Sequence, residues 1–274
     1  MEGGGWMKWS RRESKILEKR PMQNLYYISL WVFLFWVILF AVLEVFFAKR
    51  KYVDSKKSRW PVNIGFTVFN SLIIRTLPFT PVLVAFYAEN NNIGLFNAFL
   101  DIPMLLEVFL VIVIFDFIIW CHHIAFHKIP FLWRFHKVHH SDIDMDFTTA
   151  LRFHIWEAFQ SIVLKSCVVL LFGFAALPVL IFEILLNFSA MFNHANIKLP
   201  RRVDTIVSKL IVTPDFHEMH HSDKQQETDS NYGFFLSIWD YIFHTYTPHK
   251  AWAETIGLDL KKKPTLGQLF LTKF

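Results

Sequence analysis

The segment H-x-x-H-H-S-D occurs twice in the chain, at residues 136–142 and at residues 217–223. Positions i, i+3 and i+4 share one face of an α-helix, so each copy can present three imidazoles toward a common point. His123 and His127 stand one helical turn apart, just upstream of the first copy. Neutral imidazole is the commonest protein ligand for iron, zinc and copper, so eight clustered histidines indicate a centre of more than one metal ion. The fold must therefore bring two distant segments together.

The composition is that of a membrane protein. Of 274 residues, 54% are hydrophobic and 31 are Phe, which is more apolar surface than a soluble domain of this length needs. The net charge of +5 is assigned to contact with anionic lipid head groups. No nucleic-acid-binding motif accompanies it, so no nucleic acid partner is expected. Cys121 and Cys167 lie in apolar sequence without a C-x-x-C pattern, and we expect reduced packing residues.

Apolar runs predict an all-α integral membrane protein, a bundle of about four to five transmembrane or re-entrant helices. The run at 25–48 is long enough to span a bilayer, and 101–121 is a further span that leads into the first His pair. The run at 62–87 is interrupted by polar residues and prolines, which predicts one broken or kinked span. The run at 155–192 has Gly173 and Pro178 near its middle, which predicts a hairpin of two short helices.

Topology gives an independent constraint on these spans. The first His pair and the second H-x-x-H-H copy can meet only if an even number of crossings separates them, and the hairpin supplies two. Residues 49–59, 122–153 and 194–274 are therefore predicted on one side of the membrane. These segments are rich in Lys and Arg, which places the histidine cap on the cytoplasmic side. The basic N-terminal arm, residues 1–24, argues for the opposite orientation.

Several other polar residues lie near the clustered histidines. Asp116 shares a helical face with His123 and His127, so it is predicted to orient an imidazole through its free N–H; the alternative is a hydrogen bond to another helix. His154 and His194 lie at the two ends of the hairpin, and His194 is the better candidate ligand. His154 and Asn196 are possible additional ligands, whereas His244 and His249 are assigned structural roles.

At this point the ordered motifs resemble a family. They read D-x6-H-x3-H-x2-P-x-L-W-x2-H-x2-H-H-S at 116–141, R-x-H-x2-E at 152–157 and H-x-N at 194–196, followed by T-P-D-x-H-x2-H-H-S at 213–222, N-Y-G at 231–233 and W-D-x2-F at 239–243. This set resembles the sterol desaturase and fatty acid hydroxylase superfamily of membrane di-iron oxygenases, over roughly residues 100–247. The chain then divides into a basic interfacial arm (1–24), N-terminal membrane helices (25–99), a fatty acid hydroxylase-like catalytic domain (100–247) and a C-terminal tail (248–274).

The resemblance implies an O2-dependent, lipid-modifying oxidoreductase that hydroxylates or desaturates a sterol, a fatty acyl chain or a related lipid. It implies two Fe ions, replaceable by zinc, with O2 as co-substrate, in a bacterial plasma membrane or an endoplasmic reticulum. The expected metal ligands are His123, His127, His136, His139, His140, His194, His217, His220 and His221. The sequence carries no flavin or dinucleotide fingerprint, so a separate electron-donor protein is expected as a partner. Ile124 and His244 depart from the family's usual residues and leave the substrate class open.

Two other classes of protein stay open at this point. A zinc-dependent membrane hydrolase would use a metal-bound water as nucleophile. A non-catalytic metal-handling membrane protein would need no reaction at all. Structural zinc sites often use Cys, which this cluster lacks, and a transport pathway would distribute its ligands along the spans rather than beyond their ends. Both considerations favour the oxygenase.

Overall fold

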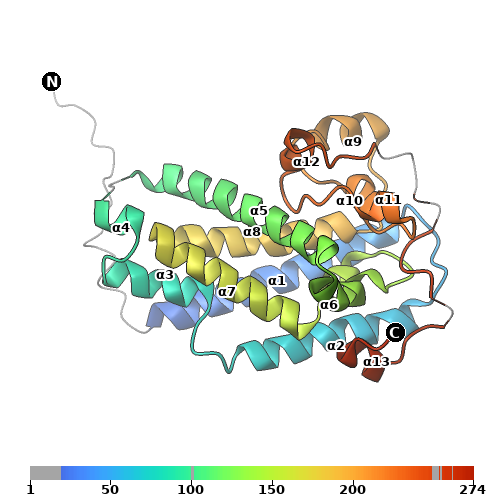
Figure 1. Cartoon of the computed structure of the whole chain (residues 1–274), viewed down its shortest axis with the longest axis horizontal. Helices are drawn as coiled ribbons and strands as arrows, with labels where there is room; N and C mark the ends of the chain where they lie inside the picture. The colour runs from blue at the N-terminus through green and yellow to red at the C-terminus, as the bar shows by residue number, and fades with distance from the viewer. Residues whose placement is uncertain (1–19, 100–101, 249–252, 254, 261) are drawn as a thin grey trace.

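The computed structural model describes residues 20–99, 102–248, 253, 255–260 and 262–274 (Figure 1). Most of the predicted basic arm, residues 1–24, lies outside the described residues. The described chain is helical, with three isolated β-bridges and no named strand. The bundle is formed by α1 (Arg20–Phe46), α2 (Lys56–Ile74), α3 (Pro81–Asn90), α4 (Leu95–Phe99), α5 (Met104–Lys128), α7 (Ile155–Phe172) and α8 (Ala176–His194). The remaining short elements form a cap at one end.

Among the described residues, four helices are long and apolar enough to cross a membrane, namely α1 over Tyr27–Phe46, α5, α7 and α8. Their outer faces present apolar side chains: in α1, Trp31 is 69% exposed and Val45 is 71% exposed. Such surface is stable only against lipid or another apolar partner. The predicted class, an all-α integral membrane protein, is confirmed. Cys121 and Cys167 are free, as expected, but are exposed on α5 and α7 rather than packed.

The predicted hairpin is present. α7 ends at Phe172, and Gly173 follows in the left-handed conformation with φ of 70°, which glycine adopts without steric cost. A Cβ atom at Gly173 would lie 2.5 Å from the backbone oxygen of Ile93, so the turn also needs glycine for close packing. α8 then begins at Ala176 and returns to the histidine end.

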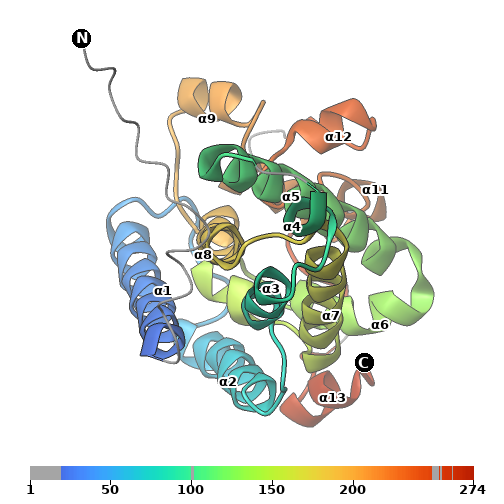
Figure 2. The same cartoon turned by 90° about the vertical axis from the view of Figure 1, so that its left-hand side faces the viewer.

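The predicted break within 62–87 is also present. α2 ends at Ile74 and α3 begins at Pro81, with Thr80 capping the new helix through a hydrogen bond from the Leu83 backbone N–H. α2 begins at Lys56, earlier than the apolar run suggested, which brings Arg59 into a helix. Neither piece is among the four candidate spans. Figure 2, which views the bundle end-on, shows α3 enclosed by the other helices, where Ala85 and Ala88 are fully buried.

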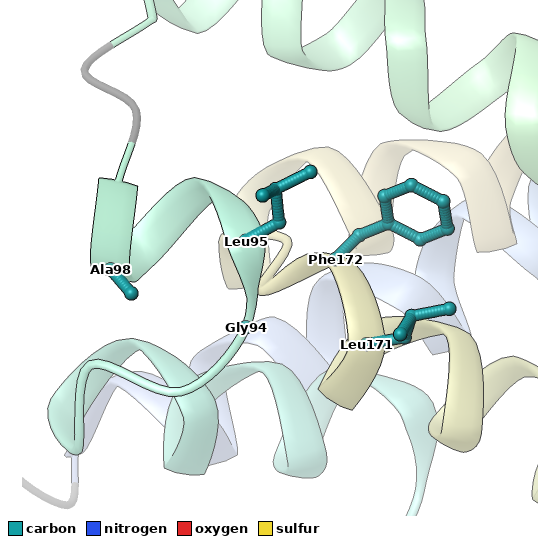
Figure 3. A pocket seen from close by; sticks show the side chains of 5 residues that line it. All are labelled: Gly94, Leu95, Ala98, Leu171 and Phe172. Carbon is teal, nitrogen blue, oxygen red and sulfur yellow. The ribbon is translucent and has the colours of Figure 1, made fainter.

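Segments 49–59 and 122–153 and the described residues of 194–274 lie at one end of the bundle, as the even-crossing argument predicted (Figure 1). An antiparallel bridge joins Ala48 to Ile197, and the Lys49 backbone N–H donates to the oxygen of Asn196. At the opposite end lies an apolar pocket between α4 and α7, lined by Gly94, Leu95, Ala98, Leu171 and Phe172 (Figure 3). It is remote from every clustered histidine.

Candidate metal centre

The ends of two candidate spans, α5 and α8, and two short helices bring the histidines together. His123 and His127 occupy the last turns of α5. Pro130 then starts α6 (Pro130–His140), where its missing N–H costs nothing, and the chain turns back so that α6 packs against α5. The second copy forms α10 (Pro214–His220), which begins with the N-cap Thr213 and Pro214 in the same manner. His194 is the last residue of α8.

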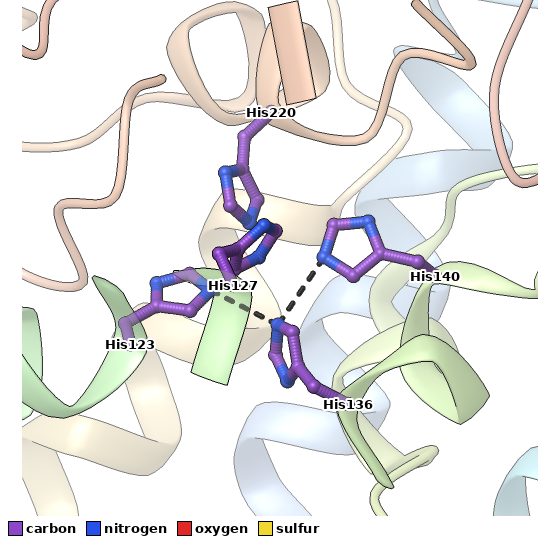
Figure 4. Close-up of side chains that lie close together, drawn as sticks. All are labelled: His123, His127, His136, His140 and His220. Carbon is purple, nitrogen blue, oxygen red and sulfur yellow. Dashed lines mark hydrogen bonds between the residues drawn. The ribbon is translucent and has the colours of Figure 1, made fainter. Parts of the chain in front are cut away.

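Nine histidines form two adjacent groups of buried side chains, whose candidate ligand atoms lie within 4.8 Å of one another in each group. The first group contains His123, His127, His136, His140 and His220 (Figure 4). The second group contains His139, His194, His217 and His221. The groups meet where the rings of His140 and His221 stack at 4.4 Å. These nine residues are the same nine that the sequence analysis nominated as ligands.

In each H-x-x-H-H copy, the middle histidine belongs to a different group from the other two histidines. In the first copy, His136 and His140 belong to the first group, whereas His139 faces the second group. In the second copy, His217 and His221 belong to the second group, whereas His220 faces the first. Each segment therefore contributes to both groups, and neither group is complete without both segments.

The ring nitrogens converge as ligand atoms would. The Nε2 atoms of His123 and His140 lie 3.1 and 3.2 Å from the Nε2 of His136. In the second group, the Nε2 of His194 lies 3.0 Å from that of His139 and 3.1 Å from those of His217 and His221. A neutral imidazole has a single N–H group, so three ring nitrogens that meet at one point cannot all be paired by hydrogen bonds to one another. Two ligands at right angles around an ion, each about 2.1 Å away, would stand about 3.0 Å apart, so the spacing fits a transition metal.

The outer ring nitrogens of the first group are held by the protein. The Nδ1 atom of His136 lies 2.8 Å from the Glu157 carboxylate. The Nδ1 atoms of His123 and His220 lie 2.8 Å from the backbone oxygens of Tyr232 and Ser230. Such contacts fix the tautomer, so that Nδ1 carries the proton and Nε2 keeps its lone pair for an ion.

The second group is held differently. The Nδ1 atom of His194 lies 2.7 Å from the Ala190 backbone oxygen. Within the described part of the chain, the buried Nδ1 atoms of His139, His217 and His221 have no hydrogen-bond partner. The Phe153 ring instead stacks on His139, with centroids 4.4 Å apart, and is partly exposed. The second group is thus fixed by packing more than by hydrogen bonds.

Burial keeps these imidazoles neutral. Burial lowers the pKa of the six histidines of the two H-x-x-H-H copies below the ordinary value, and for most of them neighbouring imidazoles lower it further. These are His136, His139, His140, His217, His220 and His221. For His136, burial lowers the pKa to about 3. A neutral ring is the form that binds a metal ion, so the site is prepared for one at neutral pH.

A buried charge network lies behind the first copy. The Arg59 guanidinium binds both oxygens of Asp142 at 2.7 and 2.8 Å, and also binds Asp146 at 2.8 Å. Burial acts to raise the pKa of Asp142, but the hydrogen bonds and charge of Arg59 outweigh it and hold that pKa below its usual range. The second copy is fixed by Glu218, which accepts from Lys49 and, at 2.7 Å, from Arg50. Cations from α2 and from the loop between α1 and α2 thus hold both copies.

Three predicted site residues take other roles. Asp116 does not orient an imidazole: its carboxylate accepts from the backbone N–H groups of Phe235 and Leu236 and from the Trp239 indole, which is the alternative role. His154 caps α7 and lies outside both groups. The Asn196 side chain accepts from the backbone N–H groups at 49 and 50 and donates to the backbone oxygen of Arg50.

Other supporting residues escaped the sequence reasoning. Arg59 looked like one more cation of a basic loop but is 1% exposed. Glu44 accepts from the backbone N–H groups of Phe147 and Asn196, joining α1 to the segments beside α6 and α8. Glu44 could have been found from the sequence, because an acidic residue near the end of an apolar span usually has a structural or functional partner.

Comparison with known proteins places this site in a family. The fatty acid hydroxylase family matches residues 108–245, half of the chain, so the chain belongs to that family and the predicted resemblance is confirmed. The match contains all nine clustered histidines.

Individual relatives are more distant. The chain is 33% identical over 171 residues to ornithine lipid hydroxylase OlsE of Rhizobium tropici, covering 61% of this chain and 50% of that protein. It is 30% identical over 130 residues to alkylglycerol monooxygenase of Danio rerio, covering 47% and 28%. It is 26% identical over 180 residues to cholesterol 25-hydroxylase of Rattus norvegicus, covering 59% of each. The chain thus spans half or less of the first two relatives. No solved structure matches it.

Proposed function

We propose that the protein is an O2-dependent, lipid-modifying oxygenase that uses two iron ions, one in each histidine group. The observation that carries this proposal is the pair of buried groups of five and four imidazoles at the end of a bundle of apolar helices. The matched relatives support it, since they include an ornithine lipid hydroxylase, an alkylglycerol monooxygenase and a cholesterol 25-hydroxylase.

The donor set favours iron over a structural zinc site. All nine candidate ligands are neutral nitrogens, and neither group includes a cysteine. Bound iron would supply the activation of dioxygen. The protein's part is to hold the imidazoles deprotonated at Nε2, which Glu157 and the backbone oxygens of Tyr232 and Ser230 do for the first group.

The surroundings suit a hydrocarbon substrate. Phe153 stacks on His139, and its ring centroid also lies 6.5 Å from that of His136. One partly exposed aromatic ring is therefore next to a histidine of each group. Phe153 lies two residues before the start of α7, a candidate span, so an alkyl chain from the bilayer would meet this ring beside both groups. Burial of the histidines excludes bulk water from the reacting carbon.

The reducing equivalents would come from a separate electron-donor protein, and the site would face the cytoplasm. Cationic side chains gather at the histidine end, including Arg201, Arg202 and Lys209, in agreement with the positive-inside rule. Labelling an introduced cysteine at Gln226 in intact cells tests this orientation. Labelling by an impermeant reagent from outside would contradict it.

One experiment separates the oxygenase from the hydrolase. Lipid extracts from cells with and without the protein, grown under ¹⁸O2, are compared by mass spectrometry, and the metal content of the purified protein is measured. Hydroxylation adds one ¹⁸O atom to a lipid, and desaturation removes two hydrogens without label. A product that forms without oxygen and takes its label from water would identify a hydrolase instead. A protein purified gently in detergent with no bound metal would overturn the proposal.

A further inference from the structure

Two short helices of the cap expose apolar side chains outside the four candidate spans. α9 (Arg201–Val207) presents Val203, Ile206 and the following Leu210, which are 45%, 70% and 53% exposed. α12 (Ile238–Ile242) ends at Ile242, which is 53% exposed, and the following residue, Phe243, is 49% exposed. The spacing i, i+3 puts Val203 and Ile206 on one face of α9, and Leu210 follows in the turn after the helix.

The two groups of apolar side chains belong to one rigid ledge, defined here as residues 198–210 together with residues 237–243. The Ser237 hydroxyl donates to the Ser208 backbone oxygen at 2.7 Å, and the Ser237 backbone N–H donates to the Leu210 oxygen at 3.0 Å. The Tyr241 hydroxyl reaches the same Ser208 oxygen at 3.3 Å. These bonds hold the end of the first segment against the start of the second.

The exposed charges of the ledge have one sign. Lys198, Arg201, Arg202 and Lys209 are exposed. The two acids of the ledge, Asp204 and Asp240, are buried at 2% and 0% exposure. Apolar side chains bordered by exposed cations, with the acids turned inward, form the pattern of a surface that rests on anionic lipid head groups.

The position of the ledge agrees with this chemistry. The candidate span α8 ends at His194, and α9 starts seven residues later. Phe243 stacks on the buried Trp120 and on the partly exposed Phe117 of α5, with ring centroids 4.8 and 5.9 Å apart, so the ledge packs directly against another candidate span. Both views show α9 and α12 on the α5 side of the bundle (Figures 1 and 2).

We propose that the ledge is a second membrane contact, which inserts Val203, Ile206, Leu210, Ile242 and Phe243 into the head-group layer of the bilayer that the bundle spans and binds anionic lipid through its cations. The contact reaches the histidines through Asp204, which accepts from the hydroxyl of Thr213 at 2.6 Å. Thr213 caps α10, the helix that carries the second H-x-x-H-H copy. The membrane surface therefore helps to place that copy.

The test uses the full chain with Cys121→Ser and Cys167→Ser, because both native cysteines are free. A nitroxide label is attached at Ile206→Cys, or at Gln226→Cys as the exposed control on α11 (Gln225–Thr228). The protein is reconstituted in vesicles of phosphatidylcholine, alone or mixed with phosphatidylglycerol. Collision of the label with dioxygen and with a water-soluble nickel chelate reports its depth. Val203→Cys repeats the test on the same face if the first variant does not fold.

We expect the label at position 206 to collide several-fold less with the nickel chelate than the label at position 226. We expect phosphatidylglycerol to shift it deeper, and Arg202→Glu with Lys209→Glu to abolish that shift. Equal nickel accessibility at both positions would overturn the proposal. So would protection of position 206 that rises with protein concentration in vesicles of fixed composition, because that result would identify a second copy as the occupant.

Discussion

The two copies of H-x-x-H-H-S-D share five of their seven residues but differ in their surroundings. Their histidines and serines are buried in both copies. The final aspartates are not equivalent: Asp142 is 2% exposed and bound by Arg59, whereas Asp223 is exposed. The second position differs as well, since Lys137 donates to the backbone of Phe274, whereas Glu218 is buried against Lys49 and Arg50. The shared residues therefore determine the spacing of the histidines, whereas residues from the surrounding segments hold each copy in place.

The two histidine groups differ in the same way. In the first group, one carboxylate and two backbone oxygens hold the outer ring nitrogens. In the second group, one backbone oxygen does so, for His194. Since outer partners orient a ligand and raise its basicity, we expect the first group to hold its ion more tightly.

The largest expected effect tests the exchange of the middle histidines. His220→Ala lies in the second copy but should remove the first group's ion and abolish lipid oxidation, as His136→Ala should. The loss should exceed the roughly 100-fold that marks the upper range for changes to outer partners. Oxygen uptake and metal per chain are measured together. His244→Asn, at an exposed position with positive φ, should retain both. Normal metal content in His220→Ala would refute the exchange.

The next prediction compares the two aspartates. Asp142→Asn leaves Arg59 buried with one fewer opposing charge, and breaking a buried ion pair costs about 3–5 kcal/mol. Asp223→Asn changes an exposed residue and should stay within about 0.5 kcal/mol. Thermal unfolding in detergent measures both variants. Equal midpoints would mean that the two copies are held alike.

A smaller effect is expected from the outer partner of His136. Glu157→Leu removes the carboxylate that lies 2.8 Å from Nδ1, so metal affinity of the first group should fall about 10–100-fold. Glu157→Gln keeps an acceptor oxygen and should fall less. Titration with a competing chelator gives the affinity of each ion. A fall confined to the second group's ion would reverse the proposed ranking.

The smallest expected effect is on pH dependence. Burial lowers the pKa of His136 to about 3, whereas a histidine in the unfolded chain titrates near 6.5. Below pH 6.5 the unfolded state therefore binds more protons than the folded state, and stability falls as the pH drops from about 6.5 toward 3. The metal-free protein should show a lower midpoint of thermal unfolding at pH 5 than at pH 7. An unchanged midpoint would indicate that the rings are reached by water.

Much of this arrangement follows from the sequence. Length and hydropathy predicted the strong spans, and Gly173 and Pro178 marked the hairpin. Helical spacing nominated eight of the clustered histidines, and His194 was nominated by its position at the end of the hairpin. The role of Asp116 was wrong because seven helical residues separate it from His123, about 10 Å along the axis, so a shared face did not imply contact. The division of each copy between two groups depends on how α6 and α10 face each other, which no local spacing contains. Arg59 was missed because a run of cations resembles a loop until α2 is seen to begin at Lys56.

The position of Arg59 and Glu44 bears on how such a protein can be dissected. Both lie before residue 108, where the family match begins. Arg59 nevertheless neutralises Asp142, and Glu44 accepts a hydrogen bond from the Phe147 backbone, within the matched segment. An excised fragment covering residues 108–245 would retain every clustered histidine but would leave Asp142 and Asp146 without their guanidinium. Chimeras that exchange catalytic segments between relatives must therefore carry α1 and α2 with them, because the smallest transferable unit is larger than the segment that sequence similarity outlines.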